Sequence, residues 1–298
     1  MAHPSPESIL VVGCGLIGTS FALALRRAVP GLVVHGVEAS PQHRRQARET
    51  GAFTEVFAHL PSPETHPSGE ALPPSGRYTL AVLAVPVDAA CAMLSAVAPL
   101  AQRVTDVCSV KGPIVEAARR AGLGEVFAPT HPMAGTAASG PAHARADLFD
   151  GRTWIVLDGW PASSSVIPWL ERTGARCVRL SGAEEHDRAM ASVSHGIHLA
   201  SLSAMLAYRE TAGPRADAWG ELAGPGFRDV TRLAASAPDF WVPTLMHNRW
   251  HVSAYLRTLA QVAGAFADIL EQADEDGLHR RLSEARSARL AWEESVNR

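Results

Sequence analysis

Short apolar runs recur along the first 180 residues of the chain, with polar or amphipathic segments between them. Runs rich in β-branched residues are typical of parallel strands, which are buried on both faces. Strands that alternate with helices predict a doubly wound parallel α/β sheet. The apolar runs cover residues 9–12, 32–37, 78–85, 103–108, 126–130, 153–157 and 176–180, and helical patterns cover 41–50, 88–100, 113–121 and 163–173.

The strand pattern ends near Gly182, and residues 183–298 show helical periodicity with breaks near Gly213 and at 224–226. We therefore predict two domains, an α/β domain at 1–182 and an all-helical domain at 183–298. Residues 60–77 are rich in Pro, Ser and Gly, which indicates a surface loop. One helical stripe, which fits a packed core, contains Leu256, Leu259, Ala263, Phe266 and Leu270.

The first apolar run leads into Gly13, Gly15 and Gly18, spaced as G-x-G-x-x-G, and a helical pattern follows. In a Rossmann-type fold the first glycine allows a sharp turn, the second allows close approach to a pyrophosphate, and the third allows the helix to pack on the strand. Leu16 and Ile17 open that helix, whose N-terminus attracts phosphate. This segment predicts a dinucleotide site.

Glu38 ends the second run, about 20 residues past the last glycine, where an acid binds the ribose hydroxyls of NAD. A carboxylate at this position repels the 2′-phosphate of NADP, although Arg44 and Arg45 follow closely. The expected cofactor is NAD. A glycine turn in an unrelated α/β protein is the alternative interpretation.

Further polar or turn residues follow the other predicted strands, namely Pro86, Ser109 and His131. In open parallel sheets, ligands bind beyond the carboxyl ends of the strands. A histidine there, beside a nicotinamide, is placed to accept a proton as hydride leaves the adjacent carbon, and its ordinary pKa suits that role.

Asp187, Ser194 and His198 lie seven and four residues apart on the first helix of the second domain, so they are expected on one face. We interpret this face as the wall of a substrate cleft, and ordinary solvated polar residues are the alternative. His195 and His198 could also form a metal pair. Because no third ligand or H-E-x-x-H pattern accompanies them, we expect no metal.

Arg228 and Arg232 lie four residues apart near a predicted helix start and could bind a carboxylate. Surface salt bridges with Asp229 and Glu221 are the alternative. A net charge of −3 gives no sign of a nucleic-acid or membrane surface, and residues 1–8 lack a signal-peptide pattern. Four scattered cysteines favour a cytoplasmic protein.

Taken together, these segments resemble the prephenate dehydrogenase family of tyrosine biosynthesis, which includes arogenate dehydrogenases. The resemblance covers nearly the whole chain. Its motifs are Gly13-Cys14-Gly15-Leu16-Ile17-Gly18, Ser109-Val110-Lys111, His131-Pro132-Met133-Ala134-Gly135, Ser194-His195-Gly196-Ile197-His198 and Gly226-Phe227-Arg228-Asp229-Val230-Thr231-Arg232.

The resemblance implies NAD-dependent oxidative decarboxylation of prephenate to 4-hydroxyphenylpyruvate. By this match His131 takes the proton of the ring hydroxyl, and Ser109 orients His131 and the nicotinamide. Ser194, His198 and Arg232 hold the substrate, and Asp187 supports them from across the domain cleft. A homodimer through the helical domain is also expected.

The chain departs from the family pattern at Ala137, where an acid is usual, and at Ile197, where a proline is common. The first departure favours prephenate over arogenate, because a neutral pocket leaves an ammonium uncompensated. Arogenate dehydrogenase therefore remains the main alternative. A 3-hydroxyacid dehydrogenase would need a lysine on the helix at 183–210, which has none, and a non-catalytic NAD sensor would not need His131.

Overall fold

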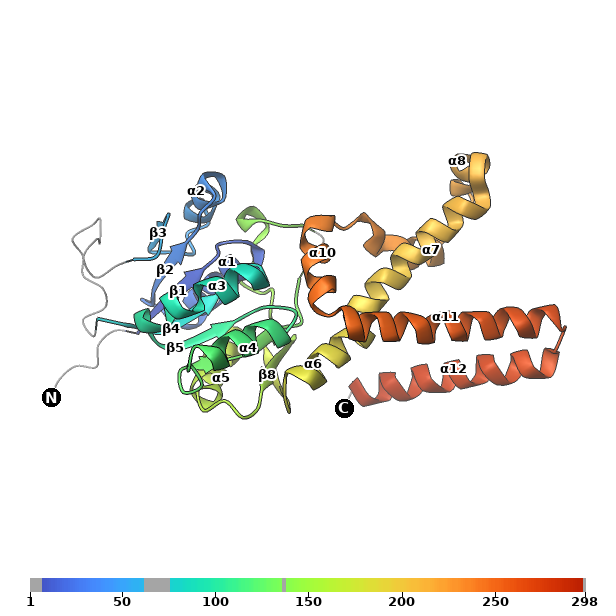
Figure 1. Cartoon of the computed structure of the whole chain (residues 1–298). Coiled ribbons are helices and arrows are strands. Elements are labelled where there is room, and N and C mark those ends of the chain that lie inside the picture. The colour runs from blue at the N-terminus through green and yellow to red at the C-terminus, as the bar shows by residue number, and fades with distance from the viewer. Residues whose placement is uncertain (1–6, 62–75, 136–137, 297–298) are drawn as a thin grey trace.

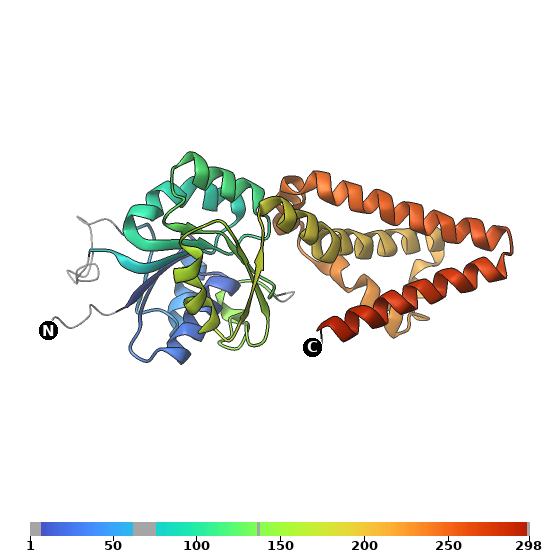
Figure 2. The ribbon, with the colours of Figure 1, turned by 90° about the horizontal axis from the view of Figure 1, so that it is seen from below.

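The computed structural model describes residues 7–61, 76–135 and 138–296. It contains an α/β unit and an elongated helical unit that extends away from it (Figures 1 and 2). The apolar runs at 9–12, 32–37, 78–85, 103–108 and 126–130 contribute strands to a parallel sheet, as the sequence predicted, and its order is β3-β2-β1-β4-β5-β6. The runs at 153–157 and 176–180 lie outside this sheet, and its edge strand β3 was not predicted. Its strands are β1 (Ser8–Val12), β2 (Val33–Val37), β3 (Glu55–Phe57), β4 (Tyr78–Leu83), β5 (Ala101–Asp106) and β6 (Phe127–Ala128).

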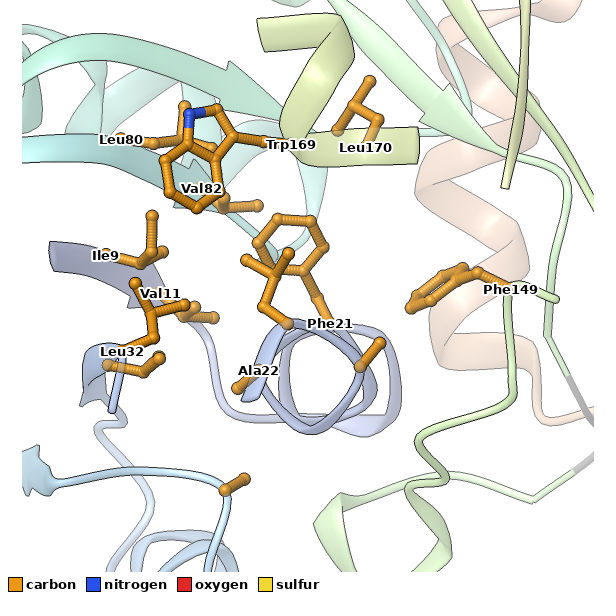
Figure 3. Close-up of a cluster of buried hydrophobic side chains, with 14 of the residues drawn as sticks. Ile9, Val11, Phe21, Ala22, Leu32, Leu80, Val82, Phe149, Trp169 and Leu170 are labelled. Atoms are coloured by element: carbon orange, nitrogen blue, oxygen red, sulfur yellow. The ribbon is translucent and has the colours of Figure 1, made fainter. Parts of the chain in front are cut away.

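Side chains alternate between the two faces of this sheet, and each face has its own apolar core. On one face, Ile9 and Val11 pack with Phe21 of α1 and with Trp169 and Leu170 of α5 (Figure 3). On the other face, Leu10 and Val12 pack with residues of α3 and α4. The helices are α1 (Leu16–Ala28), α2 (Pro41–Glu49), α3 (Val87–Val97), α4 (Gly112–Arg120) and α5 (Ser163–Glu171), with 3₁₀ turns η1 (Ala98–Leu100) and η2 (Pro141–His143).

The predicted strand at 126–130 is wrong as a single element, because Pro129 separates β6 from β7 (Thr130–Pro132). Proline has no N–H to donate, so a ladder commonly ends or changes partner at it. β7 belongs to a second, three-stranded sheet with β8 (Thr153–Leu157) and β9 (Arg176–Leu180). His131 therefore lies on an antiparallel strand opposite Ile155 rather than at the end of a strand of the main sheet.

The second domain is helical, as predicted, and its breaks are more numerous than the two the sequence indicated. The first helix is interrupted by η3, a π-helical turn between α6 and α7. The elements of the helical domain are α6 (Ala183–Met190), η3 (Ala191–His195), α7 (Gly196–Ala212), η4 (Gly213–Arg215), α8 (Ala216–Gly220), α9 (Pro225–Thr231), η5 (Arg232–Ala235), α10 (Pro238–His247), α11 (Arg249–Glu271) and α12 (Glu275–Val296).

The exact division of the chain near residue 182 stays a prediction. β9 ends at Leu180 and α6 begins at Ala183. Across this junction, the His247 imidazole of α10 lies 2.7 Å from the Asp88 carboxylate of α3. Within the described ranges, no helix combines the length and the apolar character that a membrane span requires.

Candidate active site

The glycine loop has the geometry that a dinucleotide needs. Gly13 adopts φ +98°, and a Cβ at Gly18 would lie 2.0 Å from the Gly13 carbonyl oxygen, so both positions require glycine. By contrast, a Cβ at Gly15 would meet nothing within 4 Å, so the loop faces open space there. No side chain caps the N-terminus of α1 at Gly15, and the first-turn N–H groups, including those near Leu16 and Ile17, can bind phosphate.

Glu38 lies beside this loop at the end of β2. Its carboxylate accepts hydrogen bonds from the backbone N–H groups of Cys14, at 3.1 Å, and Ser40, at 2.8 Å. The Arg44 guanidinium donates to the Glu38 carbonyl oxygen at 2.7 Å. Glu38 thus holds the β2 end against the glycine loop, which is where the adenosine ribose of a dinucleotide is bound in this fold. The residues present fit NAD.

A buried ion pair fixes the strand ends near the proposed chemistry. The Lys111 ammonium bonds the Asp106 carboxylate and also donates to the Thr130 carbonyl oxygen at 2.6 Å. Asp106 in turn accepts from the backbone N–H groups of Thr130 and Cys108. The pair ties the end of β5 to β7 and so sets the position of His131. Lys111 was part of a recognised motif, but the sequence offered no signal for a buried role.

His131 is buried on β7, and its Nδ1 lies 3.0 Å from Nε2 of His186. His186 Nδ1 lies 2.8 Å from an oxygen of Asp187. Burial and the nearby His186, Lys111 and His195 hold the pKa of His131 well below its usual value. The ring is therefore neutral at neutral pH and able to accept a proton. Sequence reasoning missed His186, because it belongs to none of the recognised motifs and lies next to Asp187 rather than three or four residues from it.

Asp187 lies at the domain junction and caps α4. Its two oxygens accept from the backbone N–H groups of Lys111, at 2.7 Å, and Gly112, at 2.8 Å. Burial raises the pKa of Asp187, but the bonds from His186, Lys111 and Gly112 outweigh it and hold this pKa below its usual value. The carboxylate is ionised at neutral pH.

The expectation that Asp187, Ser194 and His198 share one face used a uniform helical spacing, which the π turn of η3 breaks. A π turn adds a residue to the ring of backbone atoms, so the residues beyond it are rotated about the helix axis. Asp187 turns toward α4, whereas His198 stacks on Trp241 of α10 with ring centroids 3.6 Å apart. Ser194 is half-buried within the π turn itself.

His198 and its neighbours form a polar cluster at the start of α7. Asn248 donates from its amide nitrogen to the Asp187 carbonyl oxygen and to His195 Nδ1, at 2.7 and 3.0 Å. Nδ1 of His198 is buried and has no hydrogen-bond partner among the described residues. Burial lowers the pKa of His195 to about 4 and also lowers the pKa of His198. A neutral His198 with an unpartnered nitrogen can bond a substrate oxygen.

The remaining predicted residues are less tightly held. Ser109 is half-buried between β5 and α4, and no hydrogen bond joins it to His131 in the described chain. Pro86 is exposed and precedes the first turn of α3. Arg232 is exposed at the start of η5, directly after α9, which is joined to α7 by the bond from the Ser201 hydroxyl to the Val230 carbonyl oxygen.

The arginine pair does not form the surface ion pairs that were the alternative interpretation. Neither Arg228 nor Arg232 lies within ion-pair distance of Asp229 or Glu221 in the described chain. Both arginines therefore keep their charge available to an anion.

Among the described residues, no group of three or more His, Cys, Asp or Glu could hold a metal ion.

Comparisons with known proteins point to one family. Family models match residues 21–178 (prephenate dehydrogenase, nucleotide-binding domain) and 182–284 (prephenate dehydrogenase, dimerization domain). The chain is 29% identical to the prephenate dehydrogenase of Bacillus subtilis, covering 95% of this chain and 75% of that protein. It is 28% identical to the cyclohexadienyl dehydrogenase of Zymomonas mobilis, covering 96% of both.

A solved structure extends the likeness to three dimensions. Synechocystis arogenate dehydrogenase superposes with a TM-score of 0.77 at 26% identity, covering 96% of this chain and 100% of that one. Both halves of the chain match models of one family, and together the matches leave only the termini and a short junction uncovered. The chain therefore belongs to the prephenate dehydrogenase family.

Proposed function

We propose that the protein catalyses the NAD-dependent oxidative decarboxylation of prephenate to 4-hydroxyphenylpyruvate. The observation that supports this most directly is the buried His131, held by His186 and with a lowered pKa, in a chain whose glycine loop fits a dinucleotide. The family match supports the same reaction class. The glycine loop from Gly13 to Gly18 and Glu38 would hold the cofactor.

The reaction needs a base, an oriented cofactor and anchors for carboxylates. NAD, when bound, would supply the acceptor for the hydride that leaves C4 of the substrate ring. His131 takes the proton of the C4 hydroxyl, so that the oxygen becomes a carbonyl as the hydride leaves. The ring carboxylate then departs as CO₂, and the electron pair of its bond aromatises the ring to a phenolate, which takes up a proton to become the phenol. Aromatisation supplies the driving force.

Substrate binding is assigned to Ser194, His198 and Arg232. His198 offers a buried nitrogen that has no hydrogen-bond partner within residues 7–61, 76–135 and 138–296, and Arg232 offers an exposed guanidinium suited to a carboxylate. Ser109, half-buried next to α4, would orient the nicotinamide end. Asp187 supports the site by holding α4 and His186 rather than by facing the substrate.

Arogenate is the second candidate substrate. A relative of this chain is named for arogenate and another for cyclohexadienyl substrates. Our preference for prephenate rests on Ala137, which lies outside the described residues, so it is a prediction from the sequence alone. The four cysteines of the chain are free, which fits a reducing compartment such as the cytoplasm.

A homodimer through the helical domain completes the proposal. Every large apolar side chain that is exposed in the described chain lies between Val193 and Val296. The predicted core stripe on α11 is only half-buried at Leu256, Leu259 and Phe266 and exposed at Ala263 and Leu270. An isolated chain would leave this apolar surface in water, whereas a second copy would cover it.

Purified protein with NAD and either prephenate or arogenate tests the activity through the absorbance of NADH. We expect rapid NADH formation and release of CO₂ with prephenate, and a lower kcat/KM with arogenate. A higher kcat/KM with arogenate would overturn the substrate assignment. Failure of both substrates to yield NADH would overturn the proposed reaction.

A further inference from the structure

Three side chains at the domain junction form a continuous line of hydrogen bonds. His131 Nδ1 meets His186 Nε2 at 3.0 Å, and His186 Nδ1 meets Asp187 Oδ1 at 2.8 Å. The His186 side chain is fully buried, and its two nitrogens are both used in this line. Nothing in the proposed reaction gives His186 a direct contact with substrate.

The proton positions along this line follow from Asp187. The same carboxylate accepts bonds from the N–H groups of Lys111 and Gly112, which can only donate, so both of its oxygens act as acceptors. His186 must therefore donate from Nδ1. A neutral His186 then has a lone pair on Nε2, and the proton between the two rings belongs to Nδ1 of His131.

We propose that His186 is a positioning residue that holds His131 in its Nδ1–H tautomer, with Nε2 free to take the substrate proton. This inference rests on the proposed function. A charged His186 would instead donate to His131 Nδ1 and leave Nε2 of His131 protonated, which blocks its use as a base. His186 must therefore be neutral for Nε2 of His131 to accept the substrate proton.

The surroundings favour that neutral state. Burial lowers the pKa of His186; the bond to Asp187 raises it, but Lys111 lowers it again, and the net shift is downward. The titratable groups facing the two rings are Lys111 and Asp106 near the strand ends, Asp187 on α6 and His195 in η3. Lys111 is itself paired with Asp106, which limits the positive charge near the rings.

The same line stabilises His131 after it has taken the proton. The His131 imidazolium keeps its Nδ1–H bond to the lone pair on His186 Nε2. The Asp187 carboxylate, which accepts from His186 Nδ1, polarises the His186 ring and makes its Nε2 a stronger acceptor. A hydrogen-bond acceptor and a buried carboxylate therefore face the new positive charge. Because His186 lies on α6 and His131 on β7, this support depends on the packing of the two domains.

Two substitutions at His186 separate the tautomer role from packing. His186→Leu removes the acceptor, whereas His186→Gln keeps a neutral oxygen acceptor that cannot be protonated. We expect His186→Leu to lower kcat roughly 10–100-fold, the usual size for an outer-shell partner, with KM for prephenate and NAD within about twofold. His186→Gln should recover most of the kcat. His59→Leu, at an exposed histidine, is the matched control and should behave as wild type.

The acid side of the kcat profile gives a second readout. His186 accepts a hydrogen bond from the protonated His131 ring, so removal of this acceptor in His186→Leu should lower the pKa of His131 and move the acid limb to lower pH, whereas His186→Gln should leave the limb near that of wild type. Equal kcat in His186→Leu and wild type would overturn the inference, as would an equal loss in the Leu and Gln variants with folded structure intact. Absence of wild-type activity would count against the proposed function instead.

Nitrogen NMR of histidine-labelled protein tests the tautomer without turnover. The signals of His131 are assigned by their loss in His131→Asn. We expect the wild-type ring to be protonated at Nδ1 and unprotonated at Nε2 at neutral pH. An Nε2–H tautomer of His131 in the wild type would overturn the inference even if His186→Leu fails to fold.

Discussion

At the scale of single residues, His131 combines burial, a lowered pKa and a fixed orientation. Replacing it with Ala removes the base while leaving the glycine loop untouched. We expect kcat to fall roughly 10²–10⁴-fold, the usual contribution of general base catalysis. The Kd for NAD, measured by protein fluorescence quenching, should stay within about twofold. Turnover near that of wild type would place the base elsewhere.

At the same scale, we expect Glu38 to select NAD over NADP. Its carboxylate is held by two backbone N–H groups, so its charge is fixed where the ribose hydroxyls are expected. A 2′-phosphate would meet this charge, and NADP should be the poorer cofactor. Glu38→Gln keeps an acceptor for the Cys14 N–H and removes the charge.

We expect this substitution to raise the kcat/KM ratio of NADP to NAD at least tenfold, which corresponds to about 1.4 kcal/mol. Arg44 lies close by and would help to hold the phosphate once the carboxylate charge is gone. Glu55→Gln, on β3, is a control for a change of net charge. Better use of NADP than NAD by the wild type would contradict the assignment of Glu38.

At the scale of secondary elements, the join between η3 and α7 depends on Gly196. A Cβ there would lie 2.1 Å from Cδ1 of Tyr255 on α11 and 2.4 Å from the Ala191 carbonyl oxygen. The helix propensity of Ala favours Gly196→Ala, but overpacking against α11 should outweigh it and lower the free energy of unfolding by roughly 1–3 kcal/mol. Urea denaturation followed by circular dichroism measures this.

Gly264→Ala on α11 is the control, because a Cβ there meets nothing within 4 Å. That change should leave stability unchanged or raise it by up to about 1 kcal/mol through helix propensity. Equal effects at the two glycines would show that the contact with Tyr255 does not determine the packing of η3. Because Ser194 lies in this turn, Gly196→Ala should also raise the KM for prephenate.

The elements also show how far sequence reasoning reaches. Apolar runs and the glycine spacing were enough to predict the parallel sheet, because burial on both faces leaves a strong signal. The π turn of η3 left no signal that we recognised, so the uniform helical spacing that placed Asp187, Ser194 and His198 on one face does not apply across it. His186 was missed because adjacent residues of a helix point in different directions, so helical spacing did not place its side chain on the same face as that of Asp187.

At the scale of the whole molecule, α11 and α12 form a long antiparallel pair that projects from the α/β unit (Figures 1 and 2). Along α12, helical spacing places Leu282, Trp292 and Val296 on one face, and all three are more than half exposed. Such a stripe on a monomer would be a solubility hazard. We expect it to be covered by a second copy of the chain.

The dimer should respond to a charge placed on this stripe. Full-length protein at micromolar concentration should show twice the 31.6 kDa mass of the chain by light scattering. Leu282→Asp should raise the dimer Kd at least tenfold, about 1.4 kcal/mol, because a buried carboxylate without a partner is costly. Ser287→Asp adds the same charge on the opposite side of α12, and its Kd should match that of wild type. A monomeric wild type, or equal weakening by both substitutions, would contradict an interface on this face and leave the exposed stripe without the cover that we propose.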